Sequence, residues 1–323
     1  MSKPVASYVE KVEEARRRRG HAIEEWIDAI GTLVDEIEAV EAEEQAVMQA
    51  FNDPSLRREG KPYYRATWGS RRPSPTARGV GAPVYVFCRP GEGEAKCERV
   101  RKVTSRGLAS AFGQGQVARQ REQVEALKAL EKRRDDKVGT LQAIRLPLRW
   151  KVIESLVPPP TPVTGNARRG RLERMQAGRR SRAEWITEAL RATNQEVRAV
   201  EDQLEELIME VNGVGRRRNG SLVLRWKLQE GVVNGVAGPY WHVLRFSGGR
   251  RFLSTFRRSN GEGGAKSGPK TQADLRQHYL RRHADELLPL AQRVRELSEY
   301  RASLVDRLAR VGKAIQKIEV KHD

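Results

Sequence analysis

The stretch that decides the fold is residues 219–256, which read NGSLVLRWKLQEGVVNGVAGPYWHVLRFSGGRRFLSTF. Apolar and other residues alternate over residues 222–227, and this period of two is typical of a half-exposed β-strand. A second run of the same kind covers residues 240–246. Two adjacent glycines then give a tight-turn signal, which leads into a third strand at residues 251–256. The stretch therefore predicts a small curled antiparallel sheet.

This predicted sheet is strongly cationic. Residues 216–258 contain ten Lys or Arg and one acid, Glu230. Together with Trp226, Tyr240 and Trp241, this composition is typical of a surface that binds nucleic acid. The alternative is an exposed strand face that its charge merely keeps soluble.

The whole chain points to the same class of partner. It has 323 residues, a formal net charge of +19 and an isoelectric point near 10.3. Such a charge indicates a polyanionic partner, DNA or RNA, although a ribosome-like or simply soluble basic protein would share it. Charged residues make up 32% of the chain and aromatic residues 6%. This balance favours long exposed helices over one large core, and the length favours two domains.

No segment indicates export or membrane insertion. The sequence has no apolar run long enough for a transmembrane helix, and its N-terminal residues lack the apolar core of a secretory signal. We therefore expect a cytoplasmic bacterial protein, associated with the nucleoid or a plasmid. In a reducing compartment, Cys88 and Cys97 are expected to be free thiols, with a hairpin disulfide as the alternative. Their spacing is not that of metal ligands.

Two long acidic helices are predicted from heptad patterns. Residues 22–50 carry nine Asp or Glu and no Lys or Arg, and their apolar residues recur every three or four positions, as in a coiled-coil seam. Residues 52–54, Asn-Asp-Pro, should end this helix. Residues 183–212 predict a second acidic helix with a similar seam.

Two further helices each carry one arginine within an otherwise apolar seam. In residues 110–144 the arginine is Arg134, and in the last helix it is Arg301. The last helix should begin at Thr271 with a capping box in which Asp replaces the usual Glu. Pro289 should kink this helix or mark a restart.

Four other segments have distinctive compositions. Residues 57–106 read as strands and turns and hold 13 Lys or Arg against four acids, which predicts a second cationic sheet. Residues 146–166 read as a stiff proline-rich linker. Residues 168–182 contain seven arginines and predict either an arm that enters a minor groove or the solvated start of a helix. The four arginines at residues 16–19 are likewise either a solvated face or a contact with phosphate.

The two halves of the chain repeat one pattern. EEWIDAI in the first half matches AEWITEAL in the second, so Trp26 aligns with Trp185. The next tryptophans, Trp68 and Trp226, follow at intervals of 42 and 41 residues. Each half therefore reads as helix, cationic sheet, helix.

This repeat predicts an α+β protein, mainly α, made of two tandem modules. Each module is a long antiparallel coiled coil that carries a small antiparallel β-sheet at one tip. The modules cover residues 1–145 and 167–323, with the linker at residues 146–166 between them. Two copies in one chain can act as a built-in dimer, which suits a binding site with two similar half-sites.

The predicted contacts with nucleic acid lie in the two cationic sheets. Arginine pairs with phosphate and is the usual reader of guanine. Trp68 and Trp226 are expected in the core, because both halves keep them in mid-strand. Trp241 and His242 are expected either to stack on bases or to pack on the helices. The predicted binding residues are Arg65, Arg71, Arg72, Arg78, Arg99, Arg101, Lys102, Arg216, Arg217, Arg218, Arg225, Lys227, Tyr240, Trp241, His242, Arg245, Arg250, Arg251, Arg257 and Arg258.

No pattern indicates catalysis. The five histidines form no metal-ligand set with a carboxylate, and no serine lies in a nucleophile elbow. The glycine-rich segment at residues 260–270 lacks the glycine directly before lysine that a P-loop requires. We expect no catalytic residue, no metal and no cofactor. A nuclease or relaxase is the remaining enzymatic alternative.

Three short motifs in the second half resemble one known family. Their order is similar to that in accessory proteins of bacterial mobile elements, in particular the conjugative mobilisation accessory proteins that act beside the relaxase at an origin of transfer. The resemblance covers a short part of each half. It implies binding of double-stranded DNA at a defined site and recruitment of other proteins through the coils. The motifs are Arg225-Trp226, Gly238-Pro239-Tyr240-Trp241 and Gly248-Gly249-Arg250-Arg251.

The sequence therefore predicts a non-enzymatic protein that binds duplex DNA through two pseudo-repeated basic sheets. Its role would be that of an accessory or architectural factor of a plasmid, conjugative element or phage. The predicted partners are duplex DNA and proteins that dock on the acidic coiled coils, with no membrane. The alternatives are an RNA-binding or RNP-assembly protein, and a nucleoid or phage structural protein that binds DNA without sequence preference.

Overall fold

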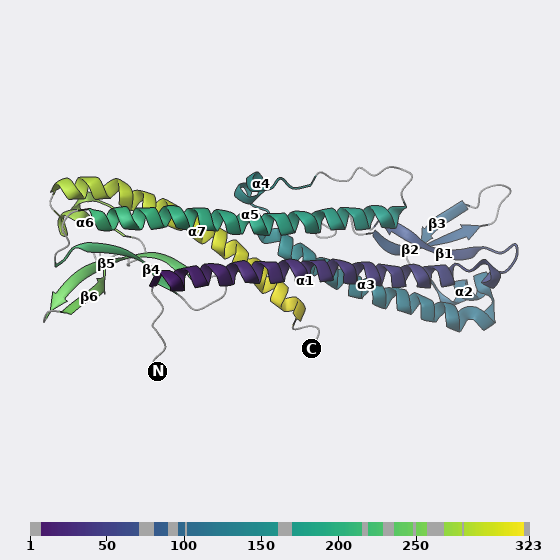
Figure 1. Cartoon of the computed structure of the whole chain (residues 1–323). Coiled ribbons are helices and arrows are strands. Elements are labelled where there is room, and N and C mark those ends of the chain that lie inside the picture. Colours follow the sequence, from purple (N-terminus) through teal and green to yellow (C-terminus); the bar gives the residue numbers. More distant parts are fainter. Residues whose placement is uncertain are drawn as a thin grey trace, which may run out of the picture. The chain divides into compact units, whose positions relative to one another are not determined.

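The computed structural model is mainly helical and has two small antiparallel sheets of three strands each (Figure 1). This confirms the predicted class, α+β and mainly α. The structure describes residues 8–70, 81–89, 96–100, 102–160, 170–214, 219–228, 236–247, 250–256, 268–279 and 281–319. The helices are α1 (Tyr8–Phe51), α2 (Ser105–Phe112), α3 (Val117–Arg145), α4 (Lys151–Leu156), α5 (Arg171–Gly213), α6 (Gln272–Arg276) and α7 (Arg281–Glu319). The strands are β1 (Tyr63–Ser70), β2 (Gly81–Arg89), β3 (Lys96–Val100), β4 (Leu222–Leu228), β5 (Val236–Ser247) and β6 (Arg250–Thr255).

The chain folds into two compact units, neither of which is continuous in sequence. Unit 1 consists of Met1–Ile27, Leu146–Pro158 and Glu188–Asp323, and unit 2 of Asp28–Arg145 and Pro159–Thr187. Helices α1 and α5 therefore each contribute one end to each unit. These units differ from the predicted modules, because each unit includes a helical segment from the other half of the chain.

In unit 2, strands β1, β2 and β3 form sheet A in that order, and both pairs are antiparallel. Tyr64 and Ala66 on the inner face of β1 belong to one apolar cluster with Phe51 of α1 and Leu127 of α3. The ring of Phe51 also meets the ring of Tyr85 edge to face, with 5.5 Å between centroids. Burial of these side chains holds one face of the sheet against the helices.

In unit 1, strands β4, β5 and β6 form sheet B with the same order and the same antiparallel pairing. Its inner face carries Leu224, Trp226 and Trp241, which are buried in one cluster with Val211 of α5 and Leu287 of α7. Trp226 is therefore a core residue, as predicted. Both sheets thus present one apolar face to long helices and leave the alternate side chains for the other face.

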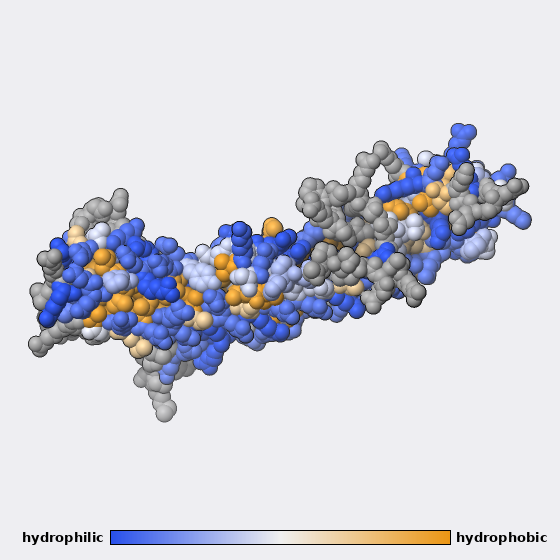
Figure 2. Space-filling model, turned by 90° about the horizontal axis from the view of Figure 1, so that it is seen from above, coloured by the Kyte–Doolittle hydropathy of each residue, from blue (hydrophilic) through white to orange (hydrophobic). Residues whose placement is uncertain are grey.

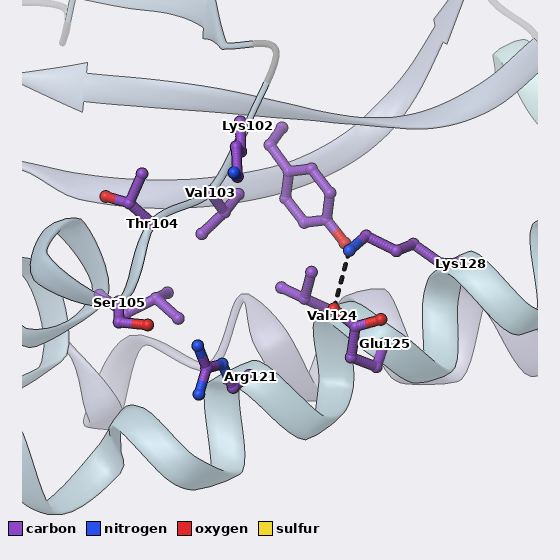
Figure 3. A pocket seen from close by; sticks show the side chains of 10 residues that line it. Lys102, Val103, Thr104, Ser105, Arg121, Val124, Glu125 and Lys128 are labelled. Carbon is purple, nitrogen blue, oxygen red and sulfur yellow. Dashed lines mark hydrogen bonds and ion pairs between the residues drawn. The ribbon is translucent and has the colours of Figure 1, made fainter.

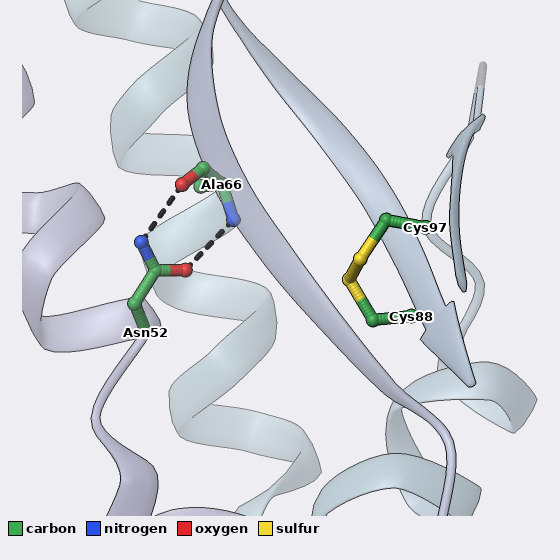
Figure 4. Close-up of a disulfide and its surroundings, with 4 residues drawn as sticks. All are labelled: Asn52, Ala66, Cys88 and Cys97. Atoms are coloured by element: carbon green, nitrogen blue, oxygen red, sulfur yellow. Dashed lines mark hydrogen bonds between the residues drawn. A yellow bond between two sulfur atoms is a disulfide. The ribbon is translucent and has the colours of Figure 1, made fainter. Parts of the chain in front are cut away.

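The C-terminal ends of α1 and α5 are attached to the sheets by the same contact. Nδ2 of Asn52 donates to the carbonyl of Ala66 at 2.7 Å, and the amide of Ala66 donates to Oδ1 of Asn52 at 2.8 Å (Figure 4). Asn212 makes the same pair of bonds with Leu224, at 2.9 and 3.0 Å. Each asparagine satisfies both backbone groups of one strand residue and so fixes the strand to the end of the helix.

The helix boundaries follow the sequence signals closely. Helix α1 ends at Phe51, directly before the predicted Asn-Asp-Pro stop. Thr271 caps α6 with the predicted capping box, in which the Asp274 carboxylate is the second member. Helix α7 passes through Pro289 without a restart. Burial of Leu287 and Ala291 on either side of the proline offsets the lost backbone hydrogen bond.

The first part of the predicted linker is folded rather than extended. A 3₁₀ turn at Leu146–Leu148 leads into α4, and Ile153 of this helix is fully buried. The guanidinium of Arg307 lies 4.2 Å from the Trp150 ring centroid. Burial of Leu148 and Ile153 in unit 1 explains the difference, because these side chains leave solvent when the segment folds. Residues 161–169 of the linker region lie outside the described residues.

Cys88 and Cys97 form a disulfide, so the prediction of two free thiols was wrong (Figure 4). The two residues are direct partners in the β2–β3 register, with 4.1 Å between their Cα atoms. Strand pairing therefore brings the sulfur atoms together, and the alternative of a hairpin disulfide is the one that holds.

Charged and polar side chains dominate the surface visible in Figure 2, with apolar patches between them. Among the helices of the described residues, none is both long and apolar enough to cross a membrane.

Candidate nucleic-acid interface

The outer face of sheet B gathers cationic side chains from β4. Because side chains alternate along a strand, the burial of Leu224 and Trp226 on the inner face turns Arg225 and Lys227 to the outer face. Both cationic residues are exposed. The sequence period of two therefore placed these charges correctly.

Strand β5 adds an aromatic ring and an imidazole to the same face. The register pairs Arg225 with Tyr240 and Val223 with His242. Nζ of Lys227 lies 4.9 Å from the centroid of the Tyr240 ring, within the range of a cation–π interaction. We call Arg225, Lys227, Tyr240 and His242 the sheet B patch.

The electrostatics of the sheet B patch favour an anionic partner. Burial lowers the pKa of His242, and the charges of Arg225 and Lys227 lower it further. Cations therefore surround this imidazole closely enough to disfavour its own protonation. Among the described residues that the register places on this face, none is Asp or Glu. A phosphate placed there would meet positive charge alone.

The sheet B patch occupies only part of the outer face. Val223 and Leu244 lie on the same face but are buried. Phe246 also lies on this face and is 47% exposed. The cations thus lie toward the end of β4, and the other end of the face is apolar.

Sheet A has a smaller cationic row on its outer face. The register places Arg65 of β1, Val86 of β2 and Arg99 of β3 side by side across the sheet. Both arginines are exposed, and we call Arg65 and Arg99 the sheet A row. The Cys88–Cys97 disulfide lies on this same outer face, two residues further along the strands.

Several predicted binding residues do not belong to either face. Trp241 is 1% exposed, so no base can stack on it in the folded protein, and we remove it from the interface. Arg245 is exposed but pairs in register with Phe252 on the opposite side of β5 from Tyr240. Lys102 follows β3 and lines a cavity beside α2 and α3. The side chains of Arg250 and Arg251 lie outside the described residues, as do Arg71, Arg72, Arg78, Arg101, Arg216, Arg217, Arg218, Arg257 and Arg258.

The two arginines that interrupted the apolar seams support the sheets from inside. Arg134 is fully buried, donates to Glu44 at 2.7 Å and lies 5.4 Å from the Trp68 ring centroid. Arg301 is 2% exposed and lies 5.7 Å from the Trp226 ring centroid, with Glu201 as its carboxylate partner. In each sheet, therefore, one tryptophan packs near a buried ion pair: Trp68 near Arg134–Glu44 and Trp226 near Arg301–Glu201.

Sequence reasoning missed a cluster of buried charges around Glu201. This carboxylate is fully buried and accepts from Arg19 at 2.8 and 2.9 Å and from Arg301 at 2.8 Å. Nε of Arg16 lies 3.2 Å from the same carboxylate. Burial opposes the charge on Glu201, but the bonds and charges of Arg19 and Arg301 outweigh it and hold its pKa below the usual value. Two arginines of the run at residues 16–19 are thus core residues, neither solvated nor available to phosphate.

The arginines near residue 180 behave in the same way. Arg179 is nearly buried and pairs with Glu41 at 2.5 Å, and Arg180 pairs with Glu38. Both lie within α5, so this part of the segment is not the flexible minor-groove arm that we considered. Residues 168 and 169 lie outside the described part of the chain.

These ion pairs are reciprocal. In α1, Glu41 lies 22 positions after Arg19, and in α5, Glu201 lies 22 positions after Arg179. Arg19 pairs with Glu201 in unit 1, and Arg179 pairs with Glu41 in unit 2. The same kind of arginine–glutamate pair between α1 and α5 thus occurs once in each unit. The signal was present in the sequence as the repeated Ala-Val-Glu motif, but spacing alone could not pair it with arginines.

In the described part of the chain, no group of three or more His, Cys, Asp or Glu side chains is placed to hold a metal ion. Comparisons of the sequence with models of protein families, with curated proteins and with solved structures give no match.

Proposed function

We propose that the protein is a non-enzymatic factor that binds duplex DNA through the outer faces of its two sheets. The observation that carries this proposal is the sheet B patch, where Arg225 and Lys227 are exposed beside Tyr240 and His242 with no described acid on the face. The sheet A row, Arg65 and Arg99, is the second contact. Several carboxylates of the acidic helices are held in ion pairs with arginines of other helices, among them Glu38, Glu41, Glu44 and Glu201.

Duplex DNA suits this surface better than a single strand. Single-strand binders offer exposed aromatic rings on which successive bases stack. Here Trp226 is 6% and Trp241 is 1% exposed, so both tryptophans of sheet B are in the core. The exposed rings of Phe246 and Phe252 lie on opposite faces of the sheet and form no stacking row. Short antiparallel strands that carry arginines can instead enter a major groove or follow its phosphates.

The finer architecture that accompanies this proposal is that of two tandem modules. Each would be an antiparallel coiled coil with a basic sheet at one tip, and the two tips would contact two similar half-sites of DNA. The reciprocal pairs Arg19–Glu201 and Arg179–Glu41 support this interpretation, because the same kind of pair occurs once in each unit. The role would be that of an accessory or architectural factor of a plasmid, conjugative element or phage, with other proteins docking on the acidic helices.

The test is the affinity of the full chain for duplex DNA, measured by fluorescence anisotropy. The double variant Arg225→Ala, Lys227→Ala should bind at least tenfold more weakly, because it loses two phosphate contacts. The control is Lys313→Ala, Lys317→Ala, which removes the same charge from exposed positions of α7 in the same unit and should leave affinity nearly unchanged. Equal weakening in both variants would show that only net charge matters.

Competition separates the alternatives. Under the proposal, duplex DNA displaces a labelled duplex more effectively than a structured RNA of equal length does, and sites selected from a random duplex pool share a sequence. A more effective RNA competitor would favour RNP assembly, and selection without enrichment would favour a nucleoid or phage structural protein. Magnesium-dependent nicking of supercoiled plasmid would reveal a nuclease or relaxase instead.

A further inference from the structure

A second cationic site lies in unit 2, on the helix side of sheet A. A cavity of about 350 Å³ opens between the loop after β3, the start of α2 and the first turns of α3 (Figure 3). The charged ends of Lys102 and Arg121 and the hydroxyl of Ser105 are directed toward this space (Figure 3). The volume is at the lower end of the range for small-molecule sites.

The lining of the cavity offers many donors and little negative charge. Lys128 also borders it, but Nζ of Lys128 donates to Glu125 at 2.7 Å, so those two charges compensate each other. Lys102 and Arg121 have no acidic partner among the described residues. The backbone amides at the start of α2 add the positive end of a helix dipole.

The hydroxyl of Tyr85 is a further hydrogen-bond donor beside the cavity. It is buried beside the cavity and has no hydrogen-bond partner among the described residues. Burial, and then the negative charges of Glu131 and Glu125, raise the pKa of Tyr85, so the phenol keeps its proton. A buried hydroxyl with no partner is costly, and a bound acceptor would remove that cost.

In unit 1, larger side chains fill the positions equivalent to this cavity, and a carboxylate compensates the charge of the helix start. Tyr85 and Trp241 each lie two residues after the proline that opposes the strand tryptophan. Trp241 is 1% exposed, and a Cβ on Gly268 would come within 2.3 Å of its Nε1. The larger indole thus occupies space that the tyrosine leaves open.

The start of α2 in unit 2 is also more open to an anion than the start of α6 in unit 1. Thr104 caps α2 and Thr271 caps α6, and the third residue after each cap is Gly107 in one and Asp274 in the other. The Asp274 carboxylate accepts from the backbone amides of Lys270 and Thr271, so an internal anion already occupies that helix start. At α2 no side chain can do so, because Gly107 has none.

The third difference concerns α3. Arg121 lies 13 residues before the buried Arg134, and Leu288 lies 13 residues before the buried Arg301. Leu288 packs against the apolar cluster of unit 1. Three aligned positions therefore differ. Unit 1 has the indole of Trp241, the carboxylate of Asp274 and the apolar side chain of Leu288. Unit 2 has the smaller ring of Tyr85, no side chain at Gly107 and the cation of Arg121.

We propose that this cavity binds a phosphate monoester, with Lys102, Arg121, Ser105 and Tyr85 as donors to the phosphoryl oxygens. A phosphoryl group has three terminal oxygens and can accept from all of these donors, whereas a carboxylate has two oxygens. Val103, Leu108 and Val124 form an apolar wall for the rest of the ligand. This site is separate from the two outer sheet faces and does not depend on their binding DNA.

The test is calorimetric titration of the full chain with inorganic phosphate, with 5′-AMP and with adenosine. We expect saturable binding of phosphate and tighter binding of 5′-AMP, but none of adenosine. Arg121→Leu introduces the leucine that unit 1 has at the equivalent position, Leu288. It should weaken the binding of 5′-AMP by about tenfold or more, because a charged donor is lost. Tyr85→Phe, which keeps the ring and its packing, should weaken it severalfold. The matched control Arg295→Ala in α7 removes a half-buried cation from unit 1 and should have no effect.

Absence of saturable binding of both phosphate and 5′-AMP to the wild-type chain at millimolar concentration would overturn the proposal. Wild-type affinity in Arg121→Leu would overturn it as well. Displacement of 5′-AMP by a 5′-phosphorylated oligonucleotide, but not by its 5′-hydroxyl form, would assign the phosphoryl group to a nucleic-acid end instead of a free small molecule. Arg121→Leu should retain duplex binding and Arg225→Ala, Lys227→Ala should retain 5′-AMP, so the two sites fail independently.

Discussion

In both sheets the tryptophan of the first strand lies opposite a proline of the neighbouring strand, Trp68 opposite Pro83 in sheet A and Trp226 opposite Pro239 in sheet B. Each tryptophan ring lies near a buried arginine of a long helix. In each sheet one asparagine at a helix end bonds both backbone groups of the strand residue two positions before the tryptophan. The inner sides of the two sheets are therefore built from the same contacts.

The outer sides are not. Arg225 in sheet B aligns with Thr67 in sheet A, and Arg65 in sheet A aligns with Val223 in sheet B. The two faces carry cations at different positions, so they would present different patterns to DNA. The exposed outer positions can differ more freely than the inner ones, because an exposed side chain contributes less to packing than a buried one. The two faces are thus expected to contact their half-sites through different side chains.

The largest expected difference between the units concerns their buried charges. Glu201→Gln leaves Arg16, Arg19 and Arg301 buried without their shared carboxylate, and it should destabilise unit 1 by about 3–5 kcal/mol. Glu44→Gln in unit 2 should cost less, because Glu44 pairs with one buried arginine, Arg134, whereas Glu201 pairs with three. Chemical denaturation followed by hydrogen exchange of the β4 and β2 amides would compare them. Equal small losses in both variants would contradict the central role given to Glu201.

The pH dependence of stability should also separate the units. Burial raises the pKa of Glu44 to about 7, opposed by Arg134 and assisted by the charges of Glu41 and Glu131. The unfolded chain releases this proton near the usual glutamate pKa of 4.5, so the folded state binds more protons between these two pH values. The stability of unit 2 should therefore fall as pH rises through that window, by on the order of 3 kcal/mol. Glu44→Gln should remove this component, and parallel pH profiles for wild type and variant would contradict the assignment.

The disulfide should act on sheet A alone. Cys88 pairs with Cys97, and at the aligned positions of sheet B Leu244 pairs with Leu253. The loop between the cysteines is short, with a sequence separation of 9, so reduction should cost roughly 2–3 kcal/mol by the chain-entropy argument. Reduction should accelerate hydrogen exchange in β2 and β3 and leave β5 and β6 unchanged. Unchanged exchange in β2 and β3 would mean that strand pairing alone holds sheet A.

The smallest losses of stability are expected for the two asparagines at the helix ends, and these losses should be similar in the two units. Asn52→Ala and Asn212→Ala each remove two hydrogen bonds to a strand residue and leave its amide and carbonyl without their partner. Each should cost about 1–3 kcal/mol, and the two losses should agree closely because the contacts are the same. Thermal unfolding of the two variants provides the measurement. A large loss in only one of them would show that the sheets are not held equivalently.

The sequence was most informative where a local pattern determines structure. The long helices, the Asn-Asp-Pro stop after α1 and the alternation in β4 all follow from local sequence patterns, and the structure has them where predicted. The class α+β followed from the same patterns. Trp226 was correctly expected in the core because both halves keep a tryptophan in mid-strand.

The sequence failed where partners come from distant segments. The arginine runs at residues 16–19 and 168–182 read as surface charge, because their carboxylates, Glu201 and Glu41, are more than a hundred residues away. Trp241 was left undecided for a related reason, since its burial depends on Gly268 and the helices. The Cys88–Cys97 disulfide required the register of β2 and β3, which composition does not give.

The salt dependence of duplex binding tests the central claim most directly. If the two outer faces together engage about eight phosphates, the slope of log K against log salt should be near −7. Arg225→Ala, Lys227→Ala and Arg65→Ala, Arg99→Ala should each make the slope shallower by about 2. A wild-type slope shallower than about −2, or variants with the wild-type slope, would contradict the assignment of the sheet faces as the DNA-binding surface.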